Sequence, residues 1–168
     1  MEKSSISKKL QDSLSKRILL LDGAYGTAIQ QYELNEDDFG GSLLAKHSKS
    51  LLGNNDFLIL TKPDVVQEIH ESYLEAGCDI LSTNTFSSTK IAQSDFDTED
   101  LCKELNFQGA QLARQVADRF SSDKKPIFVA GSLGPTNRTA SLSPDVNRLS
   151  LIHISEPTRL LSISYAVF

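Results

Sequence analysis

Short apolar runs alternate with polar loops and longer amphipathic segments along the chain, in an order that predicts strands followed by helices. Ile18–Leu21 is a continuous apolar run, which is typical of a parallel strand covered on both faces. Similar runs lie at Cys78–Ser82 and Pro126–Ala130, and each is followed by a loop of small and polar residues. Strands that alternate with helices predict an α/β fold with a parallel sheet and helices outside it.

The segment that begins at Pro63 carries apolar residues at helical spacing. Proline fits the first turn because its missing N–H would be unpaired there, and Gly77 fits the end because glycine accepts the left-handed conformation. Thr98–Phe120 predicts a second, longer helix. Its expected core-facing residues are Leu101, Leu105, Ala113, Val116, Ala117 and Phe120. Residues 1–16 predict a short amphipathic helix, and Tyr32–Asp56 predicts a loop rich in acidic residues, Gly and Asn.

Composition narrows the class of protein without identifying it. The chain has 168 residues, 39% of them hydrophobic, and a net charge of -5, which suits one ordinary domain with a core. This mild acidity argues against nucleic acid or an anionic membrane as the main partner. The N-terminal segment lacks the apolar stretch of a signal peptide, and no apolar run is long enough to span a membrane. Two cysteines without a metal-type cluster favour a reducing, cytoplasmic setting.

The loops that follow the three predicted strands are the expected place for a ligand. Ligands of parallel α/β sheets bind beyond the carboxyl ends of the strands, in open sheets and in closed barrels alike. The three loops are Asp22–Thr27, Thr83–Ser88 and Gly131–Thr136. We therefore expect these loops to meet at one edge of the sheet.

Asp22 ends the first apolar run, and two interpretations are open for it. It can cap the next helix or form an Asx turn, or it can accept a hydrogen bond from a cationic ligand group such as an ammonium. In the second case Gly23 and Gly26 let backbone N–H groups approach a ligand carboxylate. The stretch "DGAYGT" matches neither a P-loop nor a dinucleotide-binding glycine pattern, so phosphate binding is poorly supported.

The remaining polar residues have mainly structural interpretations. Thr83, Asn84 and Thr85 offer hydrogen-bonding side chains at a strand end, but the residues alone favour turn chemistry for them over ligand binding. We expect His47 and His70 to be structural, with His70 in a helix far from the ligand edge. The two cysteines are placed before the second strand and within a helix, which suits neither a nucleophile nor a zinc ligand.

Three long stretches resemble a known family: "LLLDGAYGTAIQ", "GNNDFLILTKPDVVQEIHESYLEAGCDILSTNTFSSTKIAQSDF" and "GSLGPTNRTASLSPDVN". Through them residues 17–147 closely resemble the homocysteine-binding domain of cobalamin-dependent methionine synthase. Details of the last two stretches favour the cobalamin-dependent enzyme over its betaine-using and S-methylmethionine-using relatives. The resemblance implies the N-terminal part of a (β/α)8 TIM barrel, incomplete here, with about three strands present.

The resemblance also implies a function and a set of site residues. In the family, zinc held by three cysteines of later strands binds the homocysteine sulfur, which takes a methyl group from methylcobalamin that methyltetrahydrofolate regenerates. Asp22 matches the aspartate that holds the homocysteine ammonium, and Gly23 and Ala24 match the adjoining backbone. The loop of the second strand faces the same pocket with three residues, Thr83, Asn84 and Thr85.

The chain departs from the family pattern in its last segment. The zinc cysteines are absent from the sequence, so we expect no zinc, no cobalamin and no activity for this chain alone. Its expected partners are homocysteine and the cobalamin and folate domains of a full-length enzyme. Residues 148–168 read "RLSLIHISEPTRLLSISYAVF", which resembles translated sequencing adapter and predicts an artefact or a frameshift, with a genuine divergent C-terminus as the alternative.

A different class of function remains open from the residues alone. The chain can be a non-catalytic α/β module, flavodoxin-like in its sheet, that binds a small polar ligand or another protein.

Overall fold

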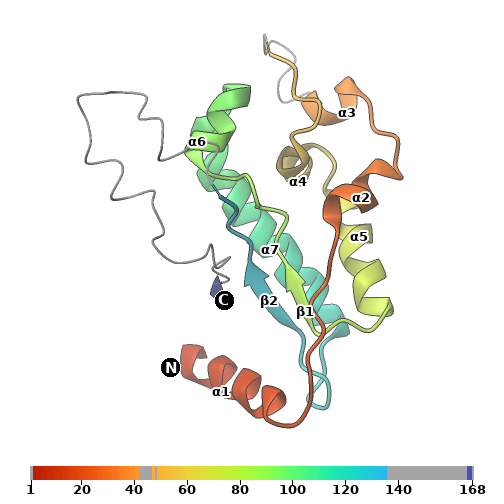
Figure 1. Ribbon diagram of the computed structural model, residues 1–168, viewed down its shortest axis with the longest axis vertical. Helices are drawn as coiled ribbons and strands as arrows, with labels where there is room; N and C mark the ends of the chain where they lie inside the picture. The colour runs from red at the N-terminus through yellow and green to blue at the C-terminus, as the bar shows by residue number, and fades with distance from the viewer. Residues whose placement is uncertain (1, 42–46, 48, 136–165, 168) are drawn as a thin grey trace, which may run out of the picture.

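The computed structural model describes residues 2–41, 47, 49–135 and 166–167, and Figure 1 shows how they are arranged. Two parallel strands form the centre, β1 (Ile80–Ser82) and β2 (Phe128–Gly131), with Leu81 opposite Val129. The predicted second and third strands are therefore confirmed. A short strand, β3 (Ala166–Val167), runs antiparallel to β2 and lies in the segment 148–168, whose other residues are outside the described part.

The first predicted strand is only partly realised. Leu21 forms an isolated parallel bridge to Ile80, and the N–H groups of Asp79 and Ile80 both donate to the carbonyl of Leu20, at 2.8 and 3.1 Å. The prediction that this run is covered on both faces is wrong, since Ile18 is 84% exposed and Leu20 57%. Among the described residues this run pairs with β1 alone, so its outer edge has no partner.

Both predicted long helices are confirmed. Helix α5 (Pro63–Glu75) begins with its proline in the first turn, and Gly77 follows it with φ of +105°, in the left-handed region that favours glycine. Helix α7 (Cys102–Phe120) follows a 3-10 turn, η4 (Glu99–Leu101), which occupies the first part of the predicted span. Phe120 is 37% exposed against expectation, because it ends α7 one turn beyond the residues that pack on the strands.

The prediction of a loop over Tyr32–Asp56 is wrong in part. This span contains helix α3 (Glu36–Gly40), whose cap residue Asn35 accepts hydrogen bonds from two backbone N–H groups while Asp38 accepts from the N–H of Asn35. This capping box stabilises a helix too short to show a period in sequence. The other short elements are α1 (Glu2–Leu14), which was predicted, and α2 (Tyr25–Gln30), η2 (Asn55–Phe57), α4 (Leu58–Thr61), α6 (Lys90–Gln93) and η3 (Ser94–Phe96).

Two clusters of buried apolar side chains hold these elements together. One lies between α5, α7 and the strands and includes Leu81 and Val116. The other lies under the short helices and includes Phe57, Leu58 and Leu105. In Figure 1 the carboxyl ends of the strands point upward, away from α1. Within the described residues, no helix has the length and apolar character needed to cross a membrane.

Candidate functional site

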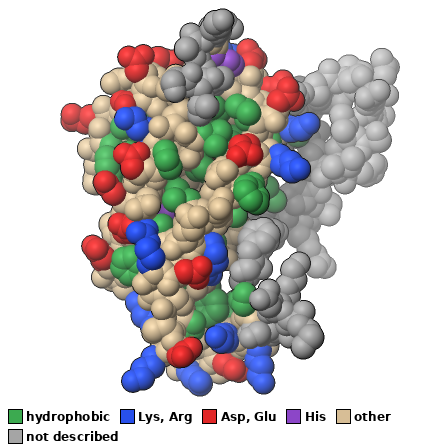
Figure 2. Space-filling model, turned by 180° about the vertical axis from the view of Figure 1, so that it is seen from behind, with side chains coloured by type: hydrophobic (Ala, Val, Ile, Leu, Met, Phe, Trp, Pro, Cys, Tyr) green, Lys and Arg blue, Asp and Glu red, His purple; other side chains and the backbone are tan. Residues whose placement is uncertain are grey.

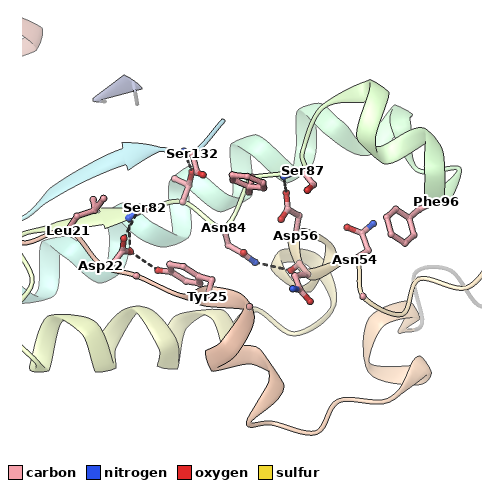
Figure 3. A pocket seen from close by; sticks show the side chains of 16 residues that line it. Leu21, Asp22, Tyr25, Asn54, Asp56, Ser82, Asn84, Ser87, Phe96 and Ser132 are labelled. Carbon is pink, nitrogen blue, oxygen red and sulfur yellow. Dashed lines mark hydrogen bonds between the residues drawn. The ribbon is translucent and has the colours of Figure 1, made fainter. Parts of the chain in front are cut away.

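A pocket of about 430 Å³ lies at the carboxyl ends of the strands, as Figure 3 shows. Asp22 and Gly23 line it from the first loop, Thr83 and Asn84 from the second, and Ser132 from the third. The expectation that three loops meet at one edge is therefore confirmed for the described residues. The third loop packs closely on the second because Gly134 has no side chain: a Cβ there would lie 2.5 Å from the carbonyl oxygen of Phe86.

Asp22 is held at the base of this pocket by three hydrogen bonds. Ser82 donates twice, from its backbone N–H to Oδ2 and from its hydroxyl to Oδ1, each at 2.7 Å. The hydroxyl of Tyr25 donates to Oδ2 at 3.0 Å. The side chain does not cap α2, whose cap residue is Ala24 and has no side-chain hydrogen bond. The capping interpretation of Asp22 is therefore wrong, and the carboxylate instead joins the first strand segment to the end of β1.

The electrostatic state of Asp22 is unusual for a buried carboxylate. The residue is only 9% exposed, and no Lys or Arg of the described residues pairs with it. Burial raises the pKa of Asp22 above its ordinary value, and the hydrogen bonds from Ser82 and Tyr25 oppose this rise. A carboxylate has about four lone-pair sites, so Oδ1 keeps room for a further donor.

His70 lies closer to this site than its sequence position predicts. It is fully buried in the middle of α5, and its Nδ1 contacts the hydroxyl of Tyr25, which in turn donates to Asp22. The prediction that His70 is far from the ligand edge is therefore wrong, because α5 packs directly against α2 and brings the ring beneath the first loop. Sequence gave no signal for this contact, since Tyr25 lies 45 positions away.

The predicted residues of the second loop have different places. The hydroxyls of Thr83 and Thr85 lie 2.7 Å apart; Thr83 accepts from the N–H of Ser132 at 2.9 Å, and Thr85 donates to the carbonyl of Ser132 at 2.9 Å. These bonds close a ring that ties the second loop to the third. Thr83 lines the pocket, whereas Thr85 is buried behind its lining.

Of the other predicted residues, Asn84 and Gly23 line the pocket and Ala24 does not. The amide of Asn84 lines the pocket and donates to the carbonyl of Asn55 at 2.9 Å. Gly23 also lines the pocket, and a Cβ at this position would lie 3.8 Å from the hydroxyl oxygen of Tyr73. Ala24 is exposed and does not line it.

One wall of the pocket was missed as a site from sequence. Asn54 lines it from the position just before η2, and Asn55 and Asp56 line it from η2 itself. Asp56 is 4% exposed and accepts from the N–H of Ser87 at 2.6 Å and the hydroxyl of Ser88 at 2.8 Å. Burial raises its pKa to about 6. The signal available was the polar stretch "GNND" directly before an apolar run, but this stretch does not follow a strand.

The described residues do not form a metal centre. No three His, Cys, Asp or Glu side chains among them lie close enough to hold an ion. Both Cys78 and Cys102 are free and buried, and burial raises the pKa of Cys78 to about 11. His47 contacts the carbonyl of Phe96 at 2.7 Å, which agrees with a structural role. The expectation that this chain alone holds neither zinc nor cobalamin stays a prediction.

The fold and the pocket define a class of protein: an α/β domain with an acidic, polar pocket at the carboxyl ends of parallel strands. A family model described as homocysteine S-methyltransferase matches residues 19–159. The chain therefore belongs to the homocysteine S-methyltransferase family. The match includes residues 148–159, beyond the boundary at residue 147 that the sequence predicted.

Solved structures of the homocysteine methyltransferase MmuM from Escherichia coli share this fold. The metallated form is 24% identical, with a TM-score of 0.55 over 75% of this chain and 41% of that one. The oxidized form is 26% identical, with a TM-score of 0.54 over 73% of this chain and 39% of that one. The chain thus spans about two fifths of the length of these proteins. These comparisons lend no support to the alternative of a non-catalytic module.

Proposed function

We propose that the pocket binds homocysteine, with its ammonium group on Asp22, and that the protein takes part in methyl transfer from methylcobalamin to the homocysteine sulfur. The family match supports homocysteine as the ligand. The cobalamin-dependent reaction rests on the resemblance of residues 17–147 to methionine synthase.

The observation that carries the proposal is the unpaired charge of Asp22. A buried carboxylate normally has a cationic partner, because removing an ion from water costs several kcal/mol. Among the described residues Asp22 has only Ser82 and Tyr25, which are neutral donors. An ammonium group supplies three N–H donors and a positive charge. A zwitterionic amino acid therefore provides the partner that the chain does not.

The other predicted residues receive roles that agree with their contacts. Gly23 leaves the backbone accessible beside Asp22, and Ala24 supplies the adjoining peptide group. Asn84 holds the pocket wall formed by Asn55. Thr83 and Thr85 hold the second and third loops together through their ring of hydrogen bonds, and so shape the pocket.

Zinc does not fit the described residues, because they contain no suitable ligand set. The contribution proposed for them is confined to binding and orienting the amino acid. Residues 17–147 would form the N-terminal part of a (β/α)8 barrel, with residues 1–16 as a preceding helix and residues 148–168 outside the barrel. The cobalamin and folate domains would be partners in a full-length enzyme, working in the cytoplasm, where two free cysteines stay reduced.

Ligand analogues test the proposed pocket directly. Titration calorimetry would compare homocysteine with 4-mercaptobutanoate, which has the same thiol and carboxylate but no ammonium. A charge-assisted hydrogen bond contributes about 1.5–3 kcal/mol, so we expect the analogue to bind about ten- to a hundredfold more weakly. Equal affinity for the two compounds would contradict the assignment of the ammonium to Asp22.

A second test concerns the reaction. Without a zinc ligand set the homocysteine thiol stays mostly protonated at pH 7, since an unperturbed cysteine thiol has a pKa of about 8.5. Incubation of the 168-residue chain with homocysteine, zinc and methylcobalamin should therefore give no more methionine than a protein-free control. Methionine formation clearly above that control would contradict the proposal that these residues only bind and orient the amino acid.

A further inference from the structure

Tyr25 and His70 form a line of side chains from the core to Asp22. Tyr25 belongs to α2 and lines the pocket, whereas His70 belongs to α5 and is fully buried. The hydroxyl of Tyr25 contacts Nδ1 of His70 on one side and donates to Oδ2 of Asp22 on the other. Figure 3 shows Tyr25 pointing at Asp22 along the floor of the pocket.

The protons of this line can be assigned from the number of donors. A tyrosine hydroxyl has one proton and can donate only one hydrogen bond. An ionised Asp22 can only accept, so the Tyr25 proton lies toward Asp22. Nδ1 of His70 must then carry a proton and donate to the Tyr25 oxygen, because otherwise two lone pairs would face each other. In a neutral imidazole this leaves Nε2 without a proton.

A second observation leads to the same tautomer. Nε2 of His70 is buried and has no hydrogen-bond partner among the described residues. A buried N–H without an acceptor is costly, and such groups are rare in proteins. The tautomer with its proton on Nδ1 places the one N–H of the ring on a partner and leaves only a lone pair at the unpartnered position. Burial lowers the pKa of His70 to about 4, so the ring is neutral at pH 7.

We propose that His70 and Tyr25 are positioning residues that keep Asp22 ionised and oriented toward the ammonium group of an amino-acid ligand. The identity of the ligand rests on the proposed function, but the hydrogen-bond line does not. The ring of Tyr25 is fixed by an edge contact with His70, at 5.3 Å between ring centroids, and a tilted contact with Tyr73, at 5.9 Å. These ring contacts hold the Tyr25 hydroxyl in place to donate to Asp22.

The line matters because Asp22 has no cation of its own among the described residues. Hydrogen bonds donated to a charged carboxylate favour the charged form and lower its pKa. Loss of the Tyr25 hydroxyl leaves only Ser82 as a donor. Cys78, which also interacts with this region, is neutral at pH 7 because burial raises its pKa to about 11. The pKa of Asp22 should therefore report directly on the hydrogen bond from Tyr25.

The test measures this line without ligand first. In the isotope-labelled chain, ring nitrogen spectra give the tautomer of His70, and carboxyl carbon titration gives the pKa of Asp22. We expect the Nδ1–H tautomer at pH 7. Tyr25→Phe should raise the pKa of Asp22 and weaken homocysteine binding by about tenfold or more, as expected for a bond to a charged group.

Two substitutions of His70 and one control separate positioning from packing. His70→Asn keeps an amide donor at the same number of bonds from Cα as Nδ1, so it should retain the pKa of Asp22 and the affinity. His70→Phe fills the space without a donor, so it should raise the pKa of Asp22 in the same direction as Tyr25→Phe but by less, because the Tyr25 hydroxyl remains. Tyr32→Phe is the control, because the Tyr32 hydroxyl also bonds a residue of α5, Glu68 at 3.1 Å, but lies outside the pocket lining.

The outcomes distinguish this proposal from the proposed function. An Nε2–H tautomer beside an ionised Asp22, or a Tyr25→Phe variant with unchanged Asp22 pKa, would overturn the positioning role. If the variants fail to fold, the tautomer in the parent chain decides. If the pKa changes are as expected but homocysteine does not bind the parent, the proposed ligand is wrong and the positioning role stands. If Asp22→Asn abolishes homocysteine binding while Tyr25→Phe has no effect, the proposed ligand stands and the positioning role is wrong.

Discussion

Asp79 and Asp22 are buried aspartates at opposite ends of the central strands, and they are held in opposite ways. Asp79, at the amino-terminal end of β1, accepts two hydrogen bonds from Arg17, at 2.6 and 2.7 Å, and one from the N–H of Leu20 at 3.0 Å. Its pKa is lowered, chiefly by the hydrogen bond from Arg17. Asp22, at the carboxyl end, has neutral donors alone, and burial raises its pKa.

The difference shows which of the two aspartates forms an ion pair within the chain. At the amino-terminal end a chain cation completes the aspartate and fixes the first strand segment to β1. At the carboxyl end no described cation pairs with Asp22, which agrees with the proposal that a ligand supplies the cation at the edge where α/β proteins bind their ligands. Figure 2 shows Lys and Arg side chains gathered at the lower end of the molecule on the face that it displays.

The largest expected effect concerns the carboxyl end. Asp22→Asn keeps the shape of the side chain but removes its charge, so homocysteine affinity should fall about ten- to a hundredfold. The melting temperature at pH 7 should not fall, because the burial that raises the pKa of Asp22 already disfavours its charge. Calorimetry and thermal melts measure both quantities. A variant that binds normally but melts well below the parent would make Asp22 a structural residue like Asp79.

The converse change should act on stability alone. Asp79→Ala removes the acceptor of the Leu20 N–H and the partner of Arg17, so the free energy of unfolding should fall by about 2 kcal/mol. Homocysteine affinity should stay within twofold of the parent, which corresponds to about 0.4 kcal/mol. Asp118→Ala is a matched control, since Asp118 pairs with Arg114 on the surface and is 67% exposed. Urea unfolding measures the free energy of unfolding of both variants. Equal losses for the two would contradict the prediction.

Asp56 gives a smaller effect with a defined pH dependence. Its folded pKa of about 6 lies above the unfolded value of about 3.9, so the native protein binds this proton more tightly. Its contribution to stability is present below about pH 4 and is lost as the pH rises through 6. Asp56→Asn should therefore stabilise the protein by about 1 kcal/mol at pH 7.5, after loss of the charged hydrogen bonds, and not at pH 4. Thermal melts at both pH values test this, and a destabilised variant at pH 7.5 would refute it.

Substitution of Arg17, the exposed partner of Asp79, should give the smallest effect. The side chain of Arg17 is 48% exposed, so its contribution is screened by water and salt. Arg17→Gln should lower the melting temperature slightly at low ionic strength and less at high salt. A loss that does not change with salt would mean that packing of the Arg17 stem, rather than its charge, stabilises this end.

Local sequence patterns were sufficient to predict the long elements and the ligand edge. The helical spacing after Pro63 and the glycine at 77 predicted α5, and the polar residues after the apolar runs predicted three converging loops. These features depend on neighbours a few positions away. Asp22 was placed at the pocket by the same logic, from its position at the end of an apolar run.

Contacts between distant residues could not be predicted in this way. The exposure of Ile18–Leu21 depends on which strands lie beside it, which an apolar run does not encode. His70 reaches the site only because α5 packs on α2, and Asp56 only because η2 lies against the second loop. The capping box at Asn35 is a local signal, but it was hidden within a stretch that is polar throughout.

The most direct test of the contrast between the two aspartates is their pKa with and without ligand. Carboxyl carbon titration of the labelled chain can follow Asp22 and Asp79 in one experiment, before and after saturation with homocysteine. Pairing with the ligand ammonium should lower the pKa of Asp22 from its raised value, as Arg17 already lowers that of Asp79, whose pKa should not change. An Asp22 pKa that stays raised in the presence of bound homocysteine would contradict the account.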